Sequence, residues 1–107
     1  AMIHDIDENQ LTNEVLKNEK LVLVEFYMKD SKPCEMQHAV LRNIKHDYQE
    51  TIDVFRIEIS DSQEIKIRFE LSAMPALLFF KNGHEVERKV GFTEREDVIA
   101  IVQELTS

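Results

Sequence analysis

The chain has 107 residues, of which 43% are hydrophobic and 32% charged, as expected for one soluble domain spanning residues 1–107. Its net charge of −8 argues against nucleic-acid binding, because phosphate recognition needs clustered lysine or arginine. One cysteine, Cys34, excludes a disulfide bond within the chain. No apolar run approaches the roughly 20 residues of a membrane span, and no secretory signal is visible at the start. We therefore expect a monomeric cytoplasmic protein.

The first quarter of the chain predicts a strand, a helix and a buried strand. Residues 3–6 have apolar residues at both ends, which indicates a short strand. Asp7 is a favourable N-cap for a helix over residues 8–18. The inward face of that helix is expected to hold Leu11, Val15 and Leu16. Residues 21–27 form an apolar, valine-rich run typical of a central strand covered on both faces, and only Glu25 interrupts it.

The middle of the chain predicts a long helix, a strand and a short helix. Apolar residues at steps of three or four indicate a helix over residues 33–50. The residues at these steps are Met36, Val40, Ile44, Asp47 and Tyr48. Residues 51–60 alternate as a strand does, with a shift of phase at Phe55. Residues 62–69 favour a short helix capped by Asp61 or Ser62, although residues 65–67 also fit a strand.

The last third predicts a hairpin and a final helix. Residues 74–80 form a second apolar strand that begins beside a proline, where a missing N–H is tolerated. Asn82-Gly83 supplies the positive φ angles of a tight turn, after which residues 84–90 return as the paired strand. Thr93 and Glu96 have the spacing of a capping box. The helix that follows is expected to bury Val98, Ile101, Val102 and Leu105. This order of elements implies an α/β fold, a mixed sheet with helices on both faces.

The turn between the central strand and the long helix carries the only thiol. Its sequence is Lys29-Asp30-Ser31-Lys32-Pro33-Cys34. A helix that opens beside Pro33 leaves backbone N–H groups unpaired near this thiol, and together with the helix dipole they favour a negative charge such as a thiolate. The four histidines show no ligand-like spacing with the cysteine, so we expect no metal and no cofactor.

Several motifs in register make the chain resemble the thioredoxin family over nearly its whole length. They are the strand Leu23-Val24-Glu25-Phe26-Tyr27, the Pro33-Cys34 pair, Met74-Pro75, the hairpin over residues 77–83 and Lys89-Val90-Gly91. The resemblance implies the thioredoxin fold, a central mixed five-stranded sheet flanked by four helices. It also implies thiol–disulfide exchange and electron transport with disulfide-containing client proteins and a thioredoxin reductase.

The chain departs from the family at the residue that starts this chemistry. The family carries Cys-x-x-Cys at the turn, and here Ser31 stands at the first cysteine position. A serine hydroxyl does not ionise near neutral pH without a base, so Ser31 cannot attack a disulfide. Four further family residues, a tryptophan, a glycine, a proline and a threonine, are replaced by Asp30, Lys32, Ala39 and Ala76.

The resemblance also assigns roles to individual residues. It implies that Cys34 is the resolving thiol, that Glu25 is a buried acid that helps to move its proton, and that Arg56 is the charged neighbour of that acid. It implies that Pro75 is a cis proline facing the turn, and that Gly91 lets the backbone of a partner approach. The substrate-binding surface is expected to hold Asp30, Lys32, Pro33, Met74, Pro75 and Gly91.

Each of these residues also has a structural interpretation. Ser31 is a favourable N-cap for the following helix, whether or not a thiol once stood there. Cys34 is either a reactive thiol near a helix N-terminus or an inert buried one, since cysteine is among the most buried residue types. Burial is expected to raise the pKa of Glu25, which serves either in proton transfer or in an ion pair with Arg56.

Three functional hypotheses follow. The first is a thioredoxin-type disulfide reductase in which Ser31 replaces the nucleophile. Such a chain is inactive, or it traps its clients and its reductase. The second is a naturally redox-inactive module that binds protein segments in a groove beside Pro75. The third is a single-thiol protein that forms mixed disulfides or a dimer through Cys34.

Overall fold

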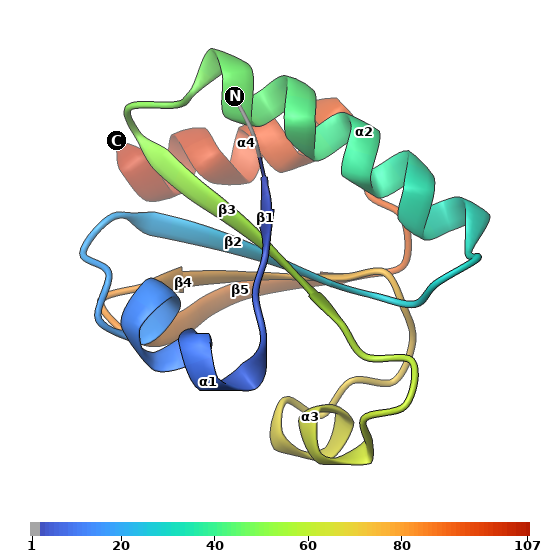
Figure 1. The fold of residues 1–107 in the computed structure, drawn as a ribbon. Coiled ribbons are helices and arrows are strands. Elements are labelled where there is room, and N and C mark those ends of the chain that lie inside the picture. The colour runs from blue at the N-terminus through green and yellow to red at the C-terminus, as the bar shows by residue number, and fades with distance from the viewer. Residues whose placement is uncertain (1–2) are drawn as a thin grey trace.

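A computed structural model describes residues 3–107, so the first two residues of the expected domain lie outside the described part. The described chain forms a five-stranded sheet with the strand order β1-β3-β2-β4-β5 (Figure 1). In chain order the elements are β1 (His4–Asp5), α1 (Glu8–Leu11), the π-helical segment η1 (Thr12–Leu16), β2 (Leu21–Tyr27), α2 (Lys32–Asp47), β3 (Ile52–Glu58), α3 (Gln63–Arg68), β4 (Ala76–Lys81), β5 (His84–Val90) and α4 (Arg95–Thr106). The sheet is mixed: β1, β3 and β2 run parallel, whereas β4 and β5 are antiparallel additions. The predicted order of elements is confirmed.

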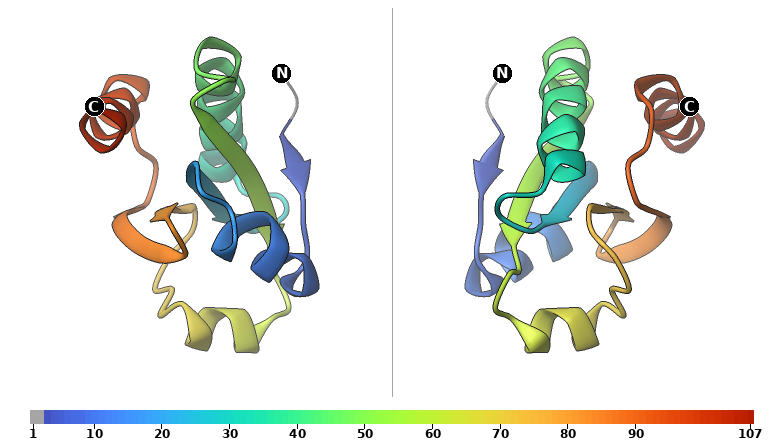
Figure 2. Two further views of the ribbon diagram at one scale, coloured as in Figure 1. Left: turned by 90° about the vertical axis from the view of Figure 1, so that its left-hand side faces the viewer. Right: turned by 90° about the vertical axis from the view of Figure 1, so that its right-hand side faces the viewer.

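Helices cover both faces of the sheet, α2 and α4 on one and α1 with α3 on the other (Figures 1 and 2). Alternate residues of β2 therefore belong to two separate cores. Leu23 packs with Leu41 of α2 and Val98 of α4, whereas Val24 packs with Leu11 of α1. Because Glu25 follows Leu23 by two residues, its side chain lies on the face that α2 and α4 cover.

The first helix is capped as predicted but ends early. Asp7 and Gln10 form a reciprocal capping box at its start. After Leu11 the chain continues as a π-helical segment, in which the N–H of Lys17 donates to the carbonyl of Thr12 at 2.9 Å. Of the predicted inward residues, Leu11 and Val15 are buried, and Leu16 is half-buried against the same core.

The apolar spacing predicted for the long helix is confirmed in part, because Ile44 is buried and Val40 and Tyr48 pack against the core. Met36 is 47% exposed, and the residues of α2 that are buried are Cys34, Gln37, Leu41 and Ile44. A polar residue, Gln37, is thus on the inward face, and sequence periodicity assigns such a residue to solvent. It is accommodated because its amide group finds two backbone partners, described below.

The remaining elements bear out the predictions except in α4, where Val98 and Val102 are buried but Ile101 and Leu105 are half-buried, and where the predicted cap is absent. Ser62 caps α3, which rules out the strand alternative for residues 65–67, and Asn82 and Gly83 adopt φ angles of 51° and 81° in the hairpin turn. The expected capping box at Thr93 is wrong, because α4 begins one residue later, after Glu94, and that residue makes no side-chain cap. The backbone of Thr93 is bound to α2 instead.

Candidate functional site

Three loops meet at the end of the sheet where β2 finishes (Figure 1). The loop after β2 leads into α2, the loop before β4 contains Pro75, and the loop after β5 contains Gly91. Register brings them together: Phe26 of β2 pairs with Ala76 of β4, and the N–H of Gly91 donates to the carbonyl of Pro75 at 2.8 Å. The Met74–Pro75 peptide bond is cis.

Ser31 is the N-cap of α2. Its backbone is extended, and its Oγ accepts a hydrogen bond from the N–H of Cys34 at 3.3 Å. Pro33 stands in the first turn, where its missing N–H leaves no hydrogen bond unmade. Asp30 just before the cap has a φ of 56°, a left-handed conformation that aspartate tolerates better than most residues. The N-cap interpretation of Ser31 is confirmed.

Cys34 is 1% exposed, although it lies in the first turn of its helix. Its side chain points toward the sheet, on the same inward face of α2 as Gln37 and Leu41. A disulfide in another protein therefore has no direct access to this sulfur in the described conformation.

A buried ion pair lies beneath the same helix. Glu25 is fully buried, and its Oε1 accepts a hydrogen bond from the Nε of Arg56 at 2.9 Å. Burial raises the pKa of Glu25 to about 7, and the nearby Arg56 guanidinium only partly offsets this effect. Among residues 3–107, no group donates a hydrogen bond to its other oxygen, Oε2. The carboxyl group is thus able to exchange a proton near neutral pH.

The ion pair is part of a larger polar cluster that sequence reasoning missed. The guanidinium of Arg56 lies over the ring of Tyr27, 3.6 Å from its centroid, and the hydroxyl of Tyr27 donates to Asp5 at 2.5 Å. Burial, followed by this hydrogen bond, raises the pKa of Tyr27 to about 12. On α2, burial and the charge of Arg56 lower the pKa of His38. The one sequence signal was the two-residue spacing of Glu25 and Tyr27, which puts both on the same face of the sheet.

The residues expected to bind a partner are mostly accessible. Asp30, Lys32 and Pro33 are exposed, Met74 and Gly91 are half-buried, and Pro75 is buried. Gly91 has a φ of 83°, and a Cβ added there would meet no atom within 4 Å. The space beside Gly91 is therefore open to another backbone. We call the surface formed by Ser31, Pro75 and Gly91 the Pro75 surface.

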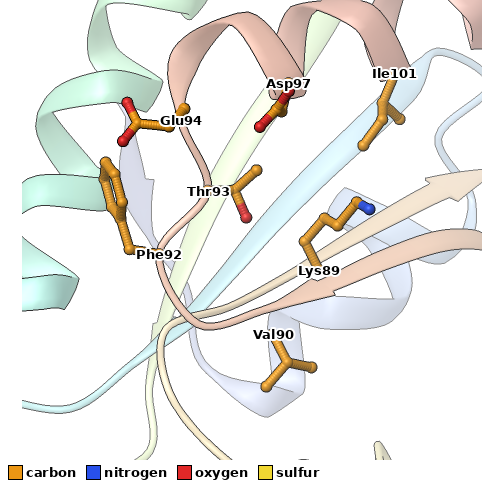
Figure 3. A pocket seen from close by; sticks show the side chains of 7 residues that line it. All are labelled: Lys89, Val90, Phe92, Thr93, Glu94, Asp97 and Ile101. Carbon is orange, nitrogen blue, oxygen red and sulfur yellow. The ribbon is translucent and has the colours of Figure 1, made fainter.

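The loop after Gly91 is held by a side chain that the sequence did not single out. The amide of Gln37 accepts a hydrogen bond from the N–H of Thr93 at 2.8 Å and donates to its carbonyl at 3.2 Å. A surface pocket of about 400 Å³ lies beside this loop, between β5 and α4 (Figure 3). One positive side chain, Lys89, and two negative ones, Glu94 and Asp97, line it.

Within residues 3–107, no three or more histidine, cysteine, aspartate or glutamate side chains come together in a way that would hold a metal ion. None of the helices in this range has both the length and the apolar character needed to cross a membrane.

Comparison with known proteins places the chain in a family. The family profile described as Thioredoxin matches residues 2–104. The chain is 28% identical to the thioredoxin of Rickettsia bellii over 98 residues, which cover 92% of this chain and 93% of that protein. It is 26% identical to thioredoxin C-2 of Corynebacterium nephridii over 104 residues, which cover 97% and 95% of the two chains. The crystal structure of a thioredoxin from Malassezia sympodialis matches with a TM-score of 0.85 at 21% identity, over 99% of this chain and 92% of that one. The chain therefore has the thioredoxin fold and belongs to the thioredoxin family of oxidoreductases.

Proposed function

We propose that this chain is a protein disulfide reductase of the thioredoxin type whose reaction cannot begin, because Ser31 stands where the attacking thiol is needed. The observation that carries this proposal is the contact between Ser31 and Cys34. The Oγ of Ser31 accepts the hydrogen bond that caps α2, and the only thiol of the chain, that of Cys34, is 1% exposed. No group at this turn is both accessible and nucleophilic toward sulfur.

The rest of the site supports the reductase lineage. If a thiol replaced the hydroxyl at position 31, its thiolate would attack one sulfur of a client disulfide, and the other client sulfur would leave as a thiolate. Cys34 would then attack the sulfur at position 31 and release the second client thiol. The two protein sulfurs would be oxidised to a disulfide and the client reduced by two electrons. Glu25, with its pKa of about 7 and an unpartnered Oε2, suits the uptake of the Cys34 proton.

The partners are part of the same proposal. The open space beside Gly91 and the position of Pro75 directly before β4 support docking of an extended client segment. Disulfide-containing clients and a thioredoxin reductase bind here without a covalent bond. With Ser31 in place, the chain therefore holds them only by non-covalent contacts. We also propose that residues 1–107 act as one monomeric domain in the cytoplasm.

Restoring the thiol tests the proposal. Ser31→Cys is expected to reduce insulin-type disulfides with a chemical reductant or with thioredoxin reductase, whereas the unmodified chain gives only the rate of the reductant alone. Ser62→Cys is the matched control, because Ser62 caps α3 with the same 3.3 Å contact and that helix covers the opposite face of the sheet. Ser31→Cys combined with Cys34→Ser should accumulate a mixed disulfide with the client. If Ser31→Cys is no faster than Ser62→Cys, the reductase proposal is wrong.

A second candidate is the naturally redox-inactive binding module. The specific observation in its favour is that Ser31 is well accommodated as a helix cap, as a native residue would be. Partners captured equally with and without reductant, together with no gain of turnover in Ser31→Cys, would favour it. The single-thiol hypothesis is supported least, because Cys34 is buried. Mass spectrometry under mild oxidant that shows a Cys34 adduct would revive it.

A further inference from the structure

We infer that Gln37 is the positioning residue of the Pro75 surface, the residue that fixes the Gly91 loop against α2. This inference rests on the proposed function, since it names what holds the same surface in shape. Gln37 does not touch a client or a reacting atom. It acts through the backbone of Thr93.

The hydrogen bonds of Gln37 imitate those of a neighbouring β-strand. Its side-chain amide both accepts from the N–H of Thr93 and donates to the carbonyl of Thr93, at 2.8 and 3.2 Å. Gln37 is fully buried and Thr93 is 8% exposed, so water does not compete for these groups. A buried N–H or carbonyl left without a partner costs about 1–3 kcal/mol. An apolar side chain at position 37 would leave the N–H and the carbonyl of Thr93 without hydrogen-bond partners. The pairing of Gln37 with Thr93 is therefore strongly favoured over an apolar contact.

A continuous chain of hydrogen bonds runs from this pair to Pro75. The hydroxyl of Thr93 donates to the carbonyl of Gly91 at 3.4 Å, and the N–H of Gly91 donates to the carbonyl of Pro75 at 2.8 Å. At its other end, Gln37 follows Cys34 by three residues, which places both on the inward face of α2. The chain thus connects all three loops of the site: the start of α2, the Pro75 loop and the Gly91 loop.

Between residues 91 and 94, no other side-chain hydrogen bond joins this loop to α2. The next one along the chain is made by Arg95, the first residue of α4, which donates to Asn43 and Asp47 of α2. Glu94, the N-cap of α4, makes no side-chain cap. Figure 3 shows the side chains of the loop diverging, with the ring of Phe92 extending toward α2 and the hydroxyl of Thr93 lying on the side of the pocket. Gly91 itself has no side chain that could pack. The Gln37 amide therefore holds the loop itself against α2, whereas Arg95 holds the start of α4.

Preorganisation is the consequence for binding. A client segment that docks beside Gly91 meets a surface already in place, and it loses less conformational entropy than it would on a mobile loop. Loss of the Gln37 amide should weaken client binding while leaving the sulfur chemistry intact.

The first test uses the chain as it exists. Gln37→Met keeps the length of the side chain and removes both hydrogen bonds. The rate at which the Thr93 amide exchanges with solvent deuterium should therefore rise about tenfold, beyond any rise caused by a lower free energy of global unfolding. Ile44→Val is the matched control, since Ile44 is buried at the other end of the same helix. If Gln37→Met accelerates Thr93 exchange no more than Ile44→Val does, the inference is overturned.

The second test links the loop to binding. In the Ser31→Cys background, Gln37→Met should raise the KM for a protein disulfide about fivefold and leave kcat unchanged. A role in stability alone would move neither constant at a temperature where both proteins are folded, and that outcome would refute the positioning role. If Ser31→Cys shows no turnover at all, the proposed function fails, and the exchange measurement still decides whether Gln37 holds the loop.

Discussion

The two faces of the sheet differ in what they bury. The face covered by α1 and α3 holds an apolar core without a charged member, built around Val24, Phe26 and Leu78. The face covered by α2 and α4 is apolar under the middle and end of α2, but near the start of that helix it holds Glu25 and Gln37, both fully buried. All polar side chains of the proposed site that are buried lie on this second face. The face under α1 and α3 thus contributes stability through apolar packing alone. On the face under α2 and α4, titratable and positioning groups occupy some of the positions that apolar side chains would otherwise fill.

Removing a large side chain from the apolar face should have the largest effect. Phe26 is fully buried and packs against Phe69, with ring centroids 5.1 Å apart. We expect Phe26→Ala to lower the free energy of unfolding by about 4 kcal/mol, because a cavity remains where the ring was. Urea denaturation followed by circular dichroism measures this loss.

The same loss should appear at acidic and alkaline pH, because no titratable group is buried in the core around Phe26. Ile67→Ala is the control, since Ile67 is 75% exposed on α3 and should change stability by less than about 0.5 kcal/mol. A loss in Phe26→Ala that varied with pH would break the contrast between the two faces.

The polar face should make stability depend on pH through Glu25. Its pKa is about 7 in the folded chain against a usual value of 4.5, so between these values the folded chain holds a proton that the unfolded chain has released. This contribution is fully present below about pH 4.5 and is lost as the pH rises through about 7. Glu25→Gln stays neutral, and we expect it to be more stable than the unmodified chain by about 3 kcal/mol near pH 8.5.

Near pH 4.5 the difference between Glu25→Gln and the unmodified chain should disappear. Urea titrations at several pH values follow this difference. Glu58→Gln is a control of opposite sign, because hydrogen bonds from Ser60 lower the pKa of Glu58 and its contribution is lost as the pH falls. Equal stability of Glu25→Gln and the unmodified chain at alkaline pH would mean that Arg56 fully compensates the buried charge.

The helix caps on the two faces should give the smallest effects and the sharpest comparison. Ser31 caps α2 and Ser62 caps α3, each with its Oγ 3.3 Å from a backbone N–H. Replacing either by alanine should lower the free energy of unfolding by about 1 kcal/mol. Only Ser31→Ala should also accelerate labelling of Cys34 by a thiol reagent in the folded protein, because only that cap holds the turn that covers the thiol.

Labelling rates under native conditions, compared with those in denaturant, check this expectation. Ser31→Gly provides a further comparison, since glycine is itself tolerated at an N-cap and should cost only a few tenths of a kcal/mol. If Ser62→Ala exposes Cys34 as much as Ser31→Ala does, the protection reflects global stability rather than the turn.

Much of the fold could be predicted from the sequence alone, because caps, strands and turns depend on residues that are close together in the chain. Asp7, Ser31 and Ser62 were recognisable as caps because a short polar side chain before a helical pattern satisfies an unpaired N–H. The run over residues 21–27 and the Asn82-Gly83 turn were recognisable because strand periodicity and positive φ angles depend on neighbours in the chain. The match of Ser31 to the first cysteine position of the family was also a prediction from the sequence.

Tertiary structure alone decided which polar residues are buried and with what partners. The burial of Gln37 on α2 was missed, because Gln37 looks like a surface residue until the backbone of Thr93, 56 residues later, supplies its hydrogen bonds. Thr93 was mistaken for a cap for the same reason. The pKa of Glu25 and the stacking of Arg56 on Tyr27 likewise depend on strands that meet only in the folded sheet. Burial and hydrogen bonding between distant segments are properties of the packed chain, and a local sequence pattern does not contain them.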